Sequence, residues 1–267
     1  MKVALREQAY QYSQGRRNFI INGVATIATT SLSVSSINLF FNHFSRIKAI
    51  AFDAFPIFDP RPVFSLAENM FPEKGRELSN IWRAKQFEYC WLRVSSKQYR
   101  DFWGVTEDSL VFASKKIGLD LSPGNRKMLM DQYLQLNIWD DVLPALKTLK
   151  KKGIRLSFLS NMTAGMIESC MNHSKIGEYF ERVISTDRVR SYKPDPKAYQ
   201  SGLDILNLKK EEILFVAFAG WDASGSKWFG YPTFWINRLA SPGEELHAKP
   251  DGIGKGMSDL LDFIRQL

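Results

Sequence analysis

Ile47-Lys48-Ala49-Ile50-Ala51-Phe52 is a short apolar run that stops at Asp53, and this stretch decides the fold. A run of this length bounded by a polar residue is typical of a strand buried on both faces. Similar runs lie at 156–159, 183–184, 213–219 and 233–236. The segments between them that follow a helical pattern are 141–151, 163–173, 195–206 and 222–229. Strands alternating with helices predict an α/β fold with a doubly wound parallel sheet.

Residues 61–139 break this alternation. They contain no convincing strand, and their long amphipathic stretches are 62–71, 75–94, 97–117 and 123–136. Ligands of such sheets bind outside the carboxyl ends of the strands, so we expect an inserted all-helical cap over that edge. The predicted organisation is an α/β core at 46–60 and 140–267, a helical cap at 61–139 and a separate segment at 1–45.

The segment 1–45 has the composition of an export signal. Its formally charged residues are Lys2, Arg6, Glu7, Arg16 and Arg17, a net charge of +3. An uncharged stretch follows, and residues 19–41 read FIINGVATIATTSLSVSSINLFF. A charged region, an apolar run and small residues are typical of a signal. The string Gly15-Arg16-Arg17-Asn18-Phe19-Ile20 is similar to the twin-arginine type.

An uncleaved membrane anchor is the alternative for the same segment. Residues 18–45 are long enough to span a bilayer, which takes roughly 20 apolar residues, and they contain no clean A-x-A cleavage site. We therefore expect export to the periplasm or a membrane tether through 18–45. If residues 1–45 are not a working signal, the expectation is a cytoplasmic protein.

The net charge of the 267-residue chain is +8, from 36 basic and 28 acidic residues. Outside 1–45 the remaining excess is scattered. Its densest patch, Lys147 with 150–152, lies near a predicted helix end, where cations favour the helix dipole. No basic stripe interleaved with aromatic residues is present, so we expect no nucleic-acid partner. A composition of 45% hydrophobic and 24% charged residues excludes wholesale disorder.

Two cysteines, Cys90 and Cys170, are too few for a disulfide framework or a metal site. One bridge in an oxidising compartment and two separate buried thiols both fit this count. Two separate thiols are the favoured interpretation.

Polar side chains follow four of the predicted strands. They are Asp53, Ser160, Asn161, Lys193 and Asp222. Each alone is compatible with a turn or cap role. In the loop that contains Lys193, for example, Asp195 is a predicted helix N-cap with Pro196 at the first helical position. As an ordered set on four strand ends, these residues predict an active site at one edge of the sheet.

Two longer strings accompany this ordered set. The first is Trp82-Arg83-Ala84-Lys85-Gln86-Phe87-Glu88-Tyr89-Cys90-Trp91-Leu92-Arg93, and the second is Trp221-Asp222-Ala223-Ser224-Gly225 followed by 229–237. The first is similar to the pattern W-R-x-K-Q-x-E-Y-x-W-L-R. Over residues 47–265 the chain resembles the haloacid dehalogenase superfamily. Both strings resemble its type II (S)-2-haloacid dehalogenase branch.

The resemblance implies hydrolysis of short (S)-2-haloacids through an ester on Asp53. By the same resemblance, Arg83 receives the halide, Lys193 lies beside the nucleophile, and Asp222 orients Lys193 and the hydrolytic water. Ser160 and the Asn161 backbone correspond to positions that hold the substrate carboxylate, and Tyr199 to a functional tyrosine. The walls of a small apolar pocket would be Phe55, Phe87, Phe102 and Trp221. The partner implied is a 2-haloacid or related carboxylate, and family members are commonly homodimers.

No cofactor or metal is expected. Phosphatases of the superfamily carry a second Asp two residues after the nucleophile, and here that position is Phe55, which cannot transfer a proton. Metal-binding members usually place two acids in the last loop, whereas Asp222 lies between Trp221 and Ala223. A phosphatase is therefore a distant third hypothesis.

The chain departs from the family pattern at three places. Asp53-Ala54-Phe55-Pro56-Ile57-Phe58-Asp59 is one residue shorter than D-x-Y-G-T-L-F-D and lacks its Thr. Residues 217–220 read AFAG where the family has S-S-N-x, and Ala84 replaces a residue that is often polar. Two hypotheses therefore remain: a working hydrolase, or a degenerate non-catalytic protein that binds a small carboxylate.

Overall fold

The computed structural model describes residues 47–267, in which six parallel strands form one sheet. The strands are β1 (Ala49–Phe52), β2 (Arg155–Ser160), β3 (Arg182–Ser185), β4 (Ile213–Ala217), β5 (Thr233–Ile236) and β6 (Gly252–Gly254). Their order is β3-β2-β1-β4-β5-β6, so β1 lies between β2 and β4. The predicted doubly wound parallel sheet is confirmed.

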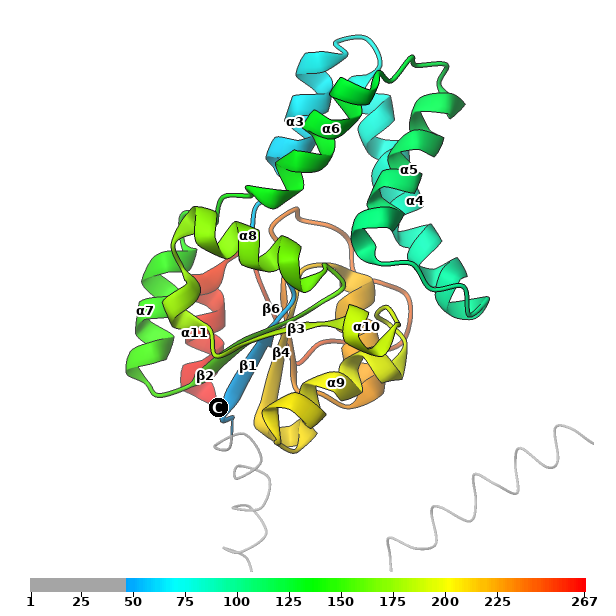
Figure 1. The fold of residues 1–267 in the computed structure, drawn as a ribbon. Helices are drawn as coiled ribbons and strands as arrows, with labels where there is room; N and C mark the ends of the chain where they lie inside the picture. The colour runs from blue at the N-terminus through cyan, green and yellow to red at the C-terminus, as the bar shows by residue number, and fades with distance from the viewer. Residues whose placement is uncertain (1–46) are drawn as a thin grey trace, which may run out of the picture. The chain divides into compact units, whose positions relative to one another are not determined.

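Five helices cover the two faces of the sheet (Figure 1). They are α7 (Val142–Lys151), α8 (Ala164–Ser174), α9 (Pro196–Leu206), α10 (Gly220–Phe229) and α11 (Met257–Gln266). Short 3-10 turns are η2 (Gly177–Tyr179), η3 (Thr186–Val189) and η4 (Lys210–Glu212). Helices α7, α8 and α11 pack with Ile50 and Phe52 of β1 in one apolar cluster. Helices α9 and α10 pack with Ala49 and Ala51 in a second cluster.

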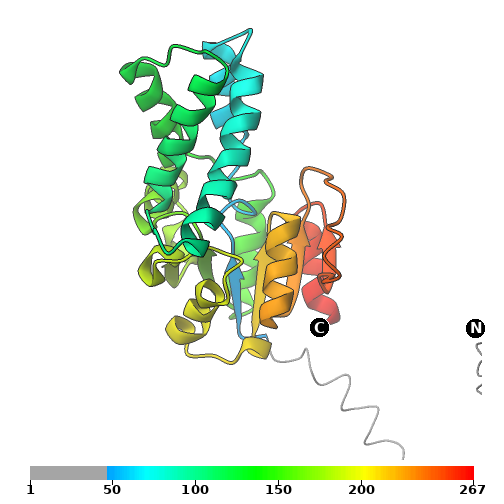
Figure 2. The ribbon, with the colours of Figure 1, turned by 90° about the vertical axis from the view of Figure 1, so that its right-hand side faces the viewer.

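Four further helices follow β1 and lie beyond the carboxyl ends of the strands (Figures 1 and 2). They are α3 (Arg61–Met70), α4 (Gly75–Ser95), α5 (Phe102–Lys116) and α6 (Pro123–Asp131), with the 3-10 turn η1 (Gln132–Leu134). As expected, residues 61–139 contain no strand, only an isolated bridge between Phe58 and Ile138. The exact limits of core and cap stay a prediction.

Local capping explains where several helices begin. The carboxylate of Asp195 accepts a hydrogen bond from the Lys197 N–H, and Pro196 is the first residue of α9, as predicted. Helix α5 begins at Phe102 rather than at 97, because the Asp101 side chain accepts from the Gly104 N–H and starts the helix there. The predicted strand 213–219 ends at Ala217, and α10 begins at Gly220, two residues earlier than predicted.

Strand β6 and helix α11 were missing from the sequence expectations. β6 is three residues long and offers Ile253, itself exposed, as its one large apolar side chain. Such a strand has no apolar run to reveal it, and it exists because it pairs with β5.

Both cysteines in the described part of the chain are free and buried, so the expectation of two separate thiols is confirmed. Burial raises the pKa of Cys170 to about 11. None of the described helices has the length and apolar character needed to cross a bilayer. The predicted signal at 1–45 lies outside the described residues.

Candidate active site

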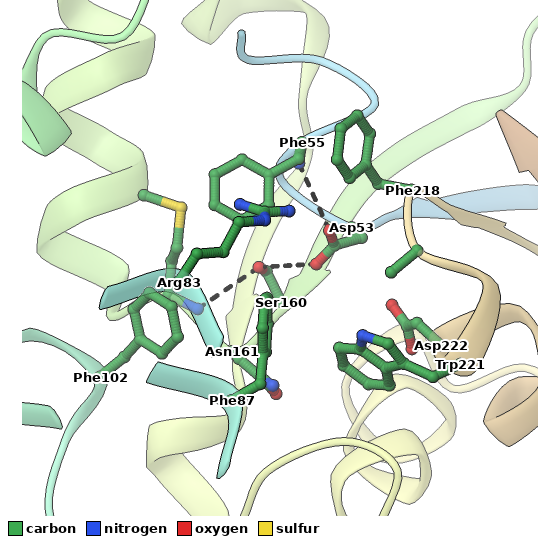
Figure 3. Close-up of a pocket in the computed structure, with 12 residues that line it drawn as sticks. Asp53, Phe55, Arg83, Phe87, Phe102, Ser160, Asn161, Phe218, Trp221 and Asp222 are labelled. Carbon is green, nitrogen blue, oxygen red and sulfur yellow. Dashed lines mark hydrogen bonds between the residues drawn. The ribbon is translucent and has the colours of Figure 1, made fainter. Parts of the chain in front are cut away.

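A small cavity of about 20 Å³ lies where the carboxyl ends of β1, β2 and β4 meet α4 and α5 (Figure 3). Its lining residues are Asp53, Phe55, Arg83, Phe87, Phe102, Ser160, Asn161, Met162, Phe218, Ala219, Trp221 and Asp222. The structure therefore brings together nine of the eleven site residues predicted from the sequence. The other two, Lys193 and Tyr199, are buried directly behind this lining.

Asp53 directly follows the central strand, and its carboxylate is held from one side. Its Oδ1 atom accepts hydrogen bonds from Ser160 Oγ and Lys193 Nζ, each at 2.9 Å. Its Oδ2 atom receives one long contact, from the Phe55 N–H at 3.4 Å. Among the described residues, Oδ2 is thus the less engaged oxygen and the one suited to attack a substrate.

Lys193 joins two carboxylates. It is 1% exposed, and its Nζ donates to Asp53 Oδ1 and to Asp222 Oδ2, the latter at 2.5 Å. Burial lowers the pKa of the ammonium group, but the two carboxylates outweigh burial and raise it. The backbone N–H of Lys193 donates to Asn161 Oδ1 at 2.9 Å, which fixes the loop that carries the lysine. Lys193 is therefore a cation at neutral pH beside the Asp53 carboxylate.

Asp222 lies in the first turn of α10 and is 1% exposed. Burial raises the pKa of its carboxyl group to about 6, although Lys193 opposes the shift. Tyr199 donates its hydroxyl proton to Asp222 Oδ1 at 2.7 Å, and burial with the neighbouring carboxylate keeps the pKa of this phenol well above 10. Tyr199 thus contacts Asp222 and lies behind the residues that line the cavity.

Arg83 reaches the cavity from α4. Its guanidinium carbon lies 5.4–5.9 Å from the ring centroids of Phe55, Phe64 and Phe87. Burial lowers the pKa of the group, and the charge of Asp53 counteracts that effect. Within the described residues, the buried Nη1 atom has no hydrogen-bond partner. A buried donor without an acceptor is costly, so this position favours an anion.

Three lining residues were not predicted from the sequence, namely Met162, Phe218 and Ala219. Phe218 packs against Phe55 with ring centroids 5.8 Å apart and narrows the cavity. Its position between two alanines at the end of β4, next to the predicted Trp221-Asp222 string, is the signal that could have identified it. The described residues hold no cluster of three or more His, Cys, Asp or Glu side chains that could bind a metal.

Comparison with known proteins identifies relatives over most of the chain. The family described as haloacid dehalogenase-like hydrolase matches residues 83–236. The chain is 40% identical over 206 residues to an (S)-2-haloacid dehalogenase of Pseudomonas sp. (strain YL), covering 77% of this chain and 89% of that protein. It is 39% identical over 220 residues to haloacetate dehalogenase H-2 of Moraxella sp. (strain B), covering 82% and 98%.

A solved structure extends the similarity to the fold. The structure of L-2-haloacid dehalogenase from Xanthobacter autotrophicus with chloropropionic acid covalently bound matches with a TM-score of 0.74 and 28% identity. The match covers 82% of this chain and 98% of that one. Sequence identity, coverage of 77–82% of this chain and the shared architecture agree, and the chain therefore belongs to the haloacid dehalogenase-like hydrolase family, in its (S)-2-haloacid dehalogenase branch.

Proposed function

We propose that the protein hydrolyses short (S)-2-haloacids to (R)-2-hydroxyacids through a covalent ester on Asp53. The observation that carries this proposal is the Asp53 carboxylate itself, enclosed in a small cavity with Oδ1 fixed and Oδ2 lightly engaged. A carboxylate is a competent nucleophile without deprotonation. The covalently bound chloropropionic acid in the structure from Xanthobacter autotrophicus supports the same chemistry.

In the first step, Asp53 Oδ2 attacks the carbon that bears the halogen. The carbon–halogen bond breaks as the carbon–oxygen bond forms, the halide leaves with the electron pair, and the configuration inverts. Arg83 lines the same cavity and has a buried N–H that lacks an acceptor among the described residues. A fixed guanidinium stabilises an emerging anion. Arg83 is therefore the residue that receives the halide.

In the second step, water attacks the carbonyl carbon of the Asp53 ester. Asp222 takes the proton of that water, since a pKa of about 6 leaves it ionised at neutral pH and basic enough to act. Lys193 stabilises the negative charge that develops on Oδ1 of Asp53, the carbonyl oxygen of the ester. Collapse of the intermediate breaks the bond between the carbonyl carbon and Oδ2, the departing hydroxyacid oxygen takes up the proton held by Asp222, and Asp53 loses its proton to water and returns to the carboxylate. Asp222 and Lys193 thus act in ester hydrolysis, whereas Arg83 acts in the release of the halide.

Substrates are small because the cavity is small. Its walls include Phe55, Phe87, Phe102 and Trp221, which exclude bulk water and strengthen the electrostatic interactions within. Ser160 and Asn161 line the cavity, and the substrate carboxylate is proposed to bind Ser160 and the Asn161 backbone. The similarity to a haloacetate dehalogenase fits a preference for short chains.

Halide release tests this function. We expect the protein to release bromide from (S)-2-bromopropionate but not from the (R) enantiomer, and Asp53→Asn to release none. No release above the Asp53→Asn background from either 2-bromopropionate or bromoacetate would contradict the proposal. Mass spectrometry of a digest adds a second observation, because the ester increases the mass of the peptide that contains Asp53.

A second candidate is a protein that forms the ester and does not turn over. Ala217 and Ala219 stand where the family pattern has Ser and Asn, and Ala219 lines the cavity. Each lost hydrogen bond could cost about 1–3 kcal/mol, equivalent to roughly 10- to 100-fold in rate. One equivalent of bromide with a lasting mass increase on Asp53 would distinguish this candidate from the hydrolase.

Export through residues 1–45 is also part of the proposal. It rests on the pair Arg16-Arg17 followed by Phe19 and Ile20 and by the uncharged stretch to residue 45. A fusion protein should change compartment when Arg16 and Arg17 are both replaced by Lys. An unchanged location would contradict twin-arginine export, and co-sedimentation with membranes would instead support a tether through 18–45. A homodimer is proposed by resemblance alone, and its mass in solution tests it.

A further inference from the structure

The turn that follows the nucleophile is held through its backbone carbonyls. Residues 54–58 form a tight turn in which the Ile57 and Phe58 N–H groups donate to Ala54 O at 3.1 and 2.9 Å. Pro56 has no N–H to contribute, and the threonine of the family pattern is missing from this turn. The turn nevertheless matters for Asp53, because the Phe55 N–H is the donor that contacts Oδ2.

Three successive carbonyls of this turn accept hydrogen bonds from outside it. Trp139 donates its indole Nε1–H to Phe55 O at 3.0 Å and its backbone N–H to Ile57 O at 3.2 Å. Arg238 donates Nη2–H to Pro56 O at 3.0 Å. Both donors come from segments far from Asp53 in sequence: Trp139 lies three residues before α7, and Arg238 follows β5.

The two donors are themselves fixed. The Arg238 side chain is 7% exposed and forms two hydrogen bonds with the Asp141 carboxylate, at 2.8 and 3.1 Å. Its guanidinium carbon lies 4.6 Å from the centroid of the Trp139 ring. Asp141 also accepts from the Met257 N–H at 2.8 Å, which joins the start of α11 to the group. Trp139, Asp141 and Arg238 thus form one rigid unit, here called the carbonyl clamp.

We propose that the carbonyl clamp positions the nucleophile, with Trp139 and Arg238 as positioning residues for the attack of Asp53 on the substrate. They act through the turn, whose Phe55 N–H contacts Oδ2 of Asp53 at 3.4 Å. The clamp takes the place of the threonine side chain that this shortened turn lacks. The inference rests on the proposed function, since it assigns the clamp to the alkylation step of that reaction.

Single-turnover kinetics of the full chain test the proposal. Trp139→Phe keeps an aromatic ring and removes the Nε1–H donor, whereas Arg238→Gln replaces the charged guanidinium that donates to Pro56 O by a shorter, neutral amide. A nucleophile displaced by a fraction of an ångström reacts much more slowly, and we expect the rate of the first bromide release to fall by about tenfold in each variant. Arg238→Lys, which keeps a charge and a donor, should recover part of that loss.

Matched controls remove the same kind of contact elsewhere. Arg155 pairs with Glu181 and donates to Leu206 O, and Trp82 donates Nε1–H to Thr106 O. Arg155→Gln and Trp82→Phe should change the rate of bromide release by less than about twofold, even where their melting temperatures fall as much as those of the clamp variants. A release rate in the clamp variants that matches these controls at equal melting temperature would overturn the proposal.

Hydrogen–deuterium exchange supplies a measurement independent of turnover. The backbone amides of Phe55, Ile57 and Phe58 should exchange faster in Arg238→Gln and Trp139→Phe than in the two control variants. Unchanged exchange there would overturn the clamp whatever the kinetics show. If the unmodified chain releases no halide while exchange responds as expected, the proposed function is contradicted. The conclusion that Trp139 and Arg238 fix the backbone of the turn is then still supported.

Discussion

Asp222 illustrates how burial sets the chemistry of a single residue. Its carboxylate receives hydrogen bonds from Lys193 and Tyr199, which favour the charged form. Burial nevertheless dominates and raises its pKa to about 6. A carboxyl group with this pKa is a stronger base than an exposed aspartate and is still ionised at neutral pH.

The pH dependence of ester hydrolysis follows from this value. While Asp53 is ionised, its charge contributes to the pKa of about 6 of the Asp222 carboxyl group. The ester removes that charge, so in the intermediate Asp222 becomes protonated, and stops accepting the proton of the attacking water, only below pH 6. We expect hydroxyacid formation to decline below pH 6, measured as product formed at saturating substrate. In Asp222→Asn the residual rate should lack this decline, and the same decline in that variant would assign it to another group.

Ala219 offers a gain-of-function prediction. Its side chain lines the cavity, at the position where the family pattern has Asn. Asn there restores a donor and an acceptor for water, so Ala219→Asn should accelerate hydrolysis of the Asp53 ester by about tenfold. The decay of the ester mass after a single turnover measures this rate. For comparison, the decay of the ester mass is also measured in Ala217→Ser, which changes a fully buried residue of β4.

At the scale of elements, Asp141 joins three segments that are distant in sequence. It immediately precedes α7, binds Arg238 after β5 and accepts from the Met257 N–H at the start of α11. Burial alone would raise its pKa, but the hydrogen bonds from Arg238 and Met257 lower it from 3.8. The folded protein therefore prefers the ionised carboxylate.

Acid stability should reflect this preference. Since the folded-state pKa of Asp141 is below the unfolded value, its stabilising effect is complete above about pH 5 and is lost as the pH falls through the lower pKa. Asp141→Asn should lower the melting temperature most at neutral pH and least near pH 3. A difference between the two proteins that does not shrink with acid would show that the ionised carboxylate is unimportant.

The sequence predicts the sheet better than it predicts the tertiary contacts that hold the turn after Asp53. Buried strands such as β1 leave uninterrupted apolar runs, and Asp195 with Pro196 leaves a local helix signal. β6 leaves none, because pairing with β5 creates it. The predicted pocket residues, apart from Phe102 at the start of α5, follow strand ends or repeat family strings. Trp139 does neither, and Arg238 follows β5 just outside the family string. The roles of both depend on tertiary contacts with carbonyls that carry no sequence signal.

At the scale of the whole molecule, one apolar cluster extends from the cap helices into the sheet. It includes Leu78, Trp82 and Val105 of the cap together with Phe52 and Phe58 from the nucleophile strand and its turn. The boundary between the two parts is therefore packed as an interior. We expect the described part of the chain to unfold as one cooperative unit.

Trp82→Ala tests this cooperativity. Trp82 is fully buried in α4, so its truncation should cost about 3–5 kcal/mol and lower the melting temperature of the entire described unit. Calorimetry should still record one transition. Trp228→Ala, at a residue 59% exposed, should change stability by less than about 0.5 kcal/mol. Two separate transitions in Trp82→Ala would show that cap and sheet unfold independently.

This shared cluster also limits how such proteins can be recombined. Phe55, Ile57 and Phe58 belong to the turn after the nucleophile, yet they pack in the same cluster as α3 and α4. A cap grafted from a relative with a longer turn would meet mismatched surfaces unless its own turn came with it. A cap should therefore be exchanged between relatives together with residues 53–60. For the same reason, a substitution in the cap that changes this packing requires a compensating substitution in the nucleophile turn.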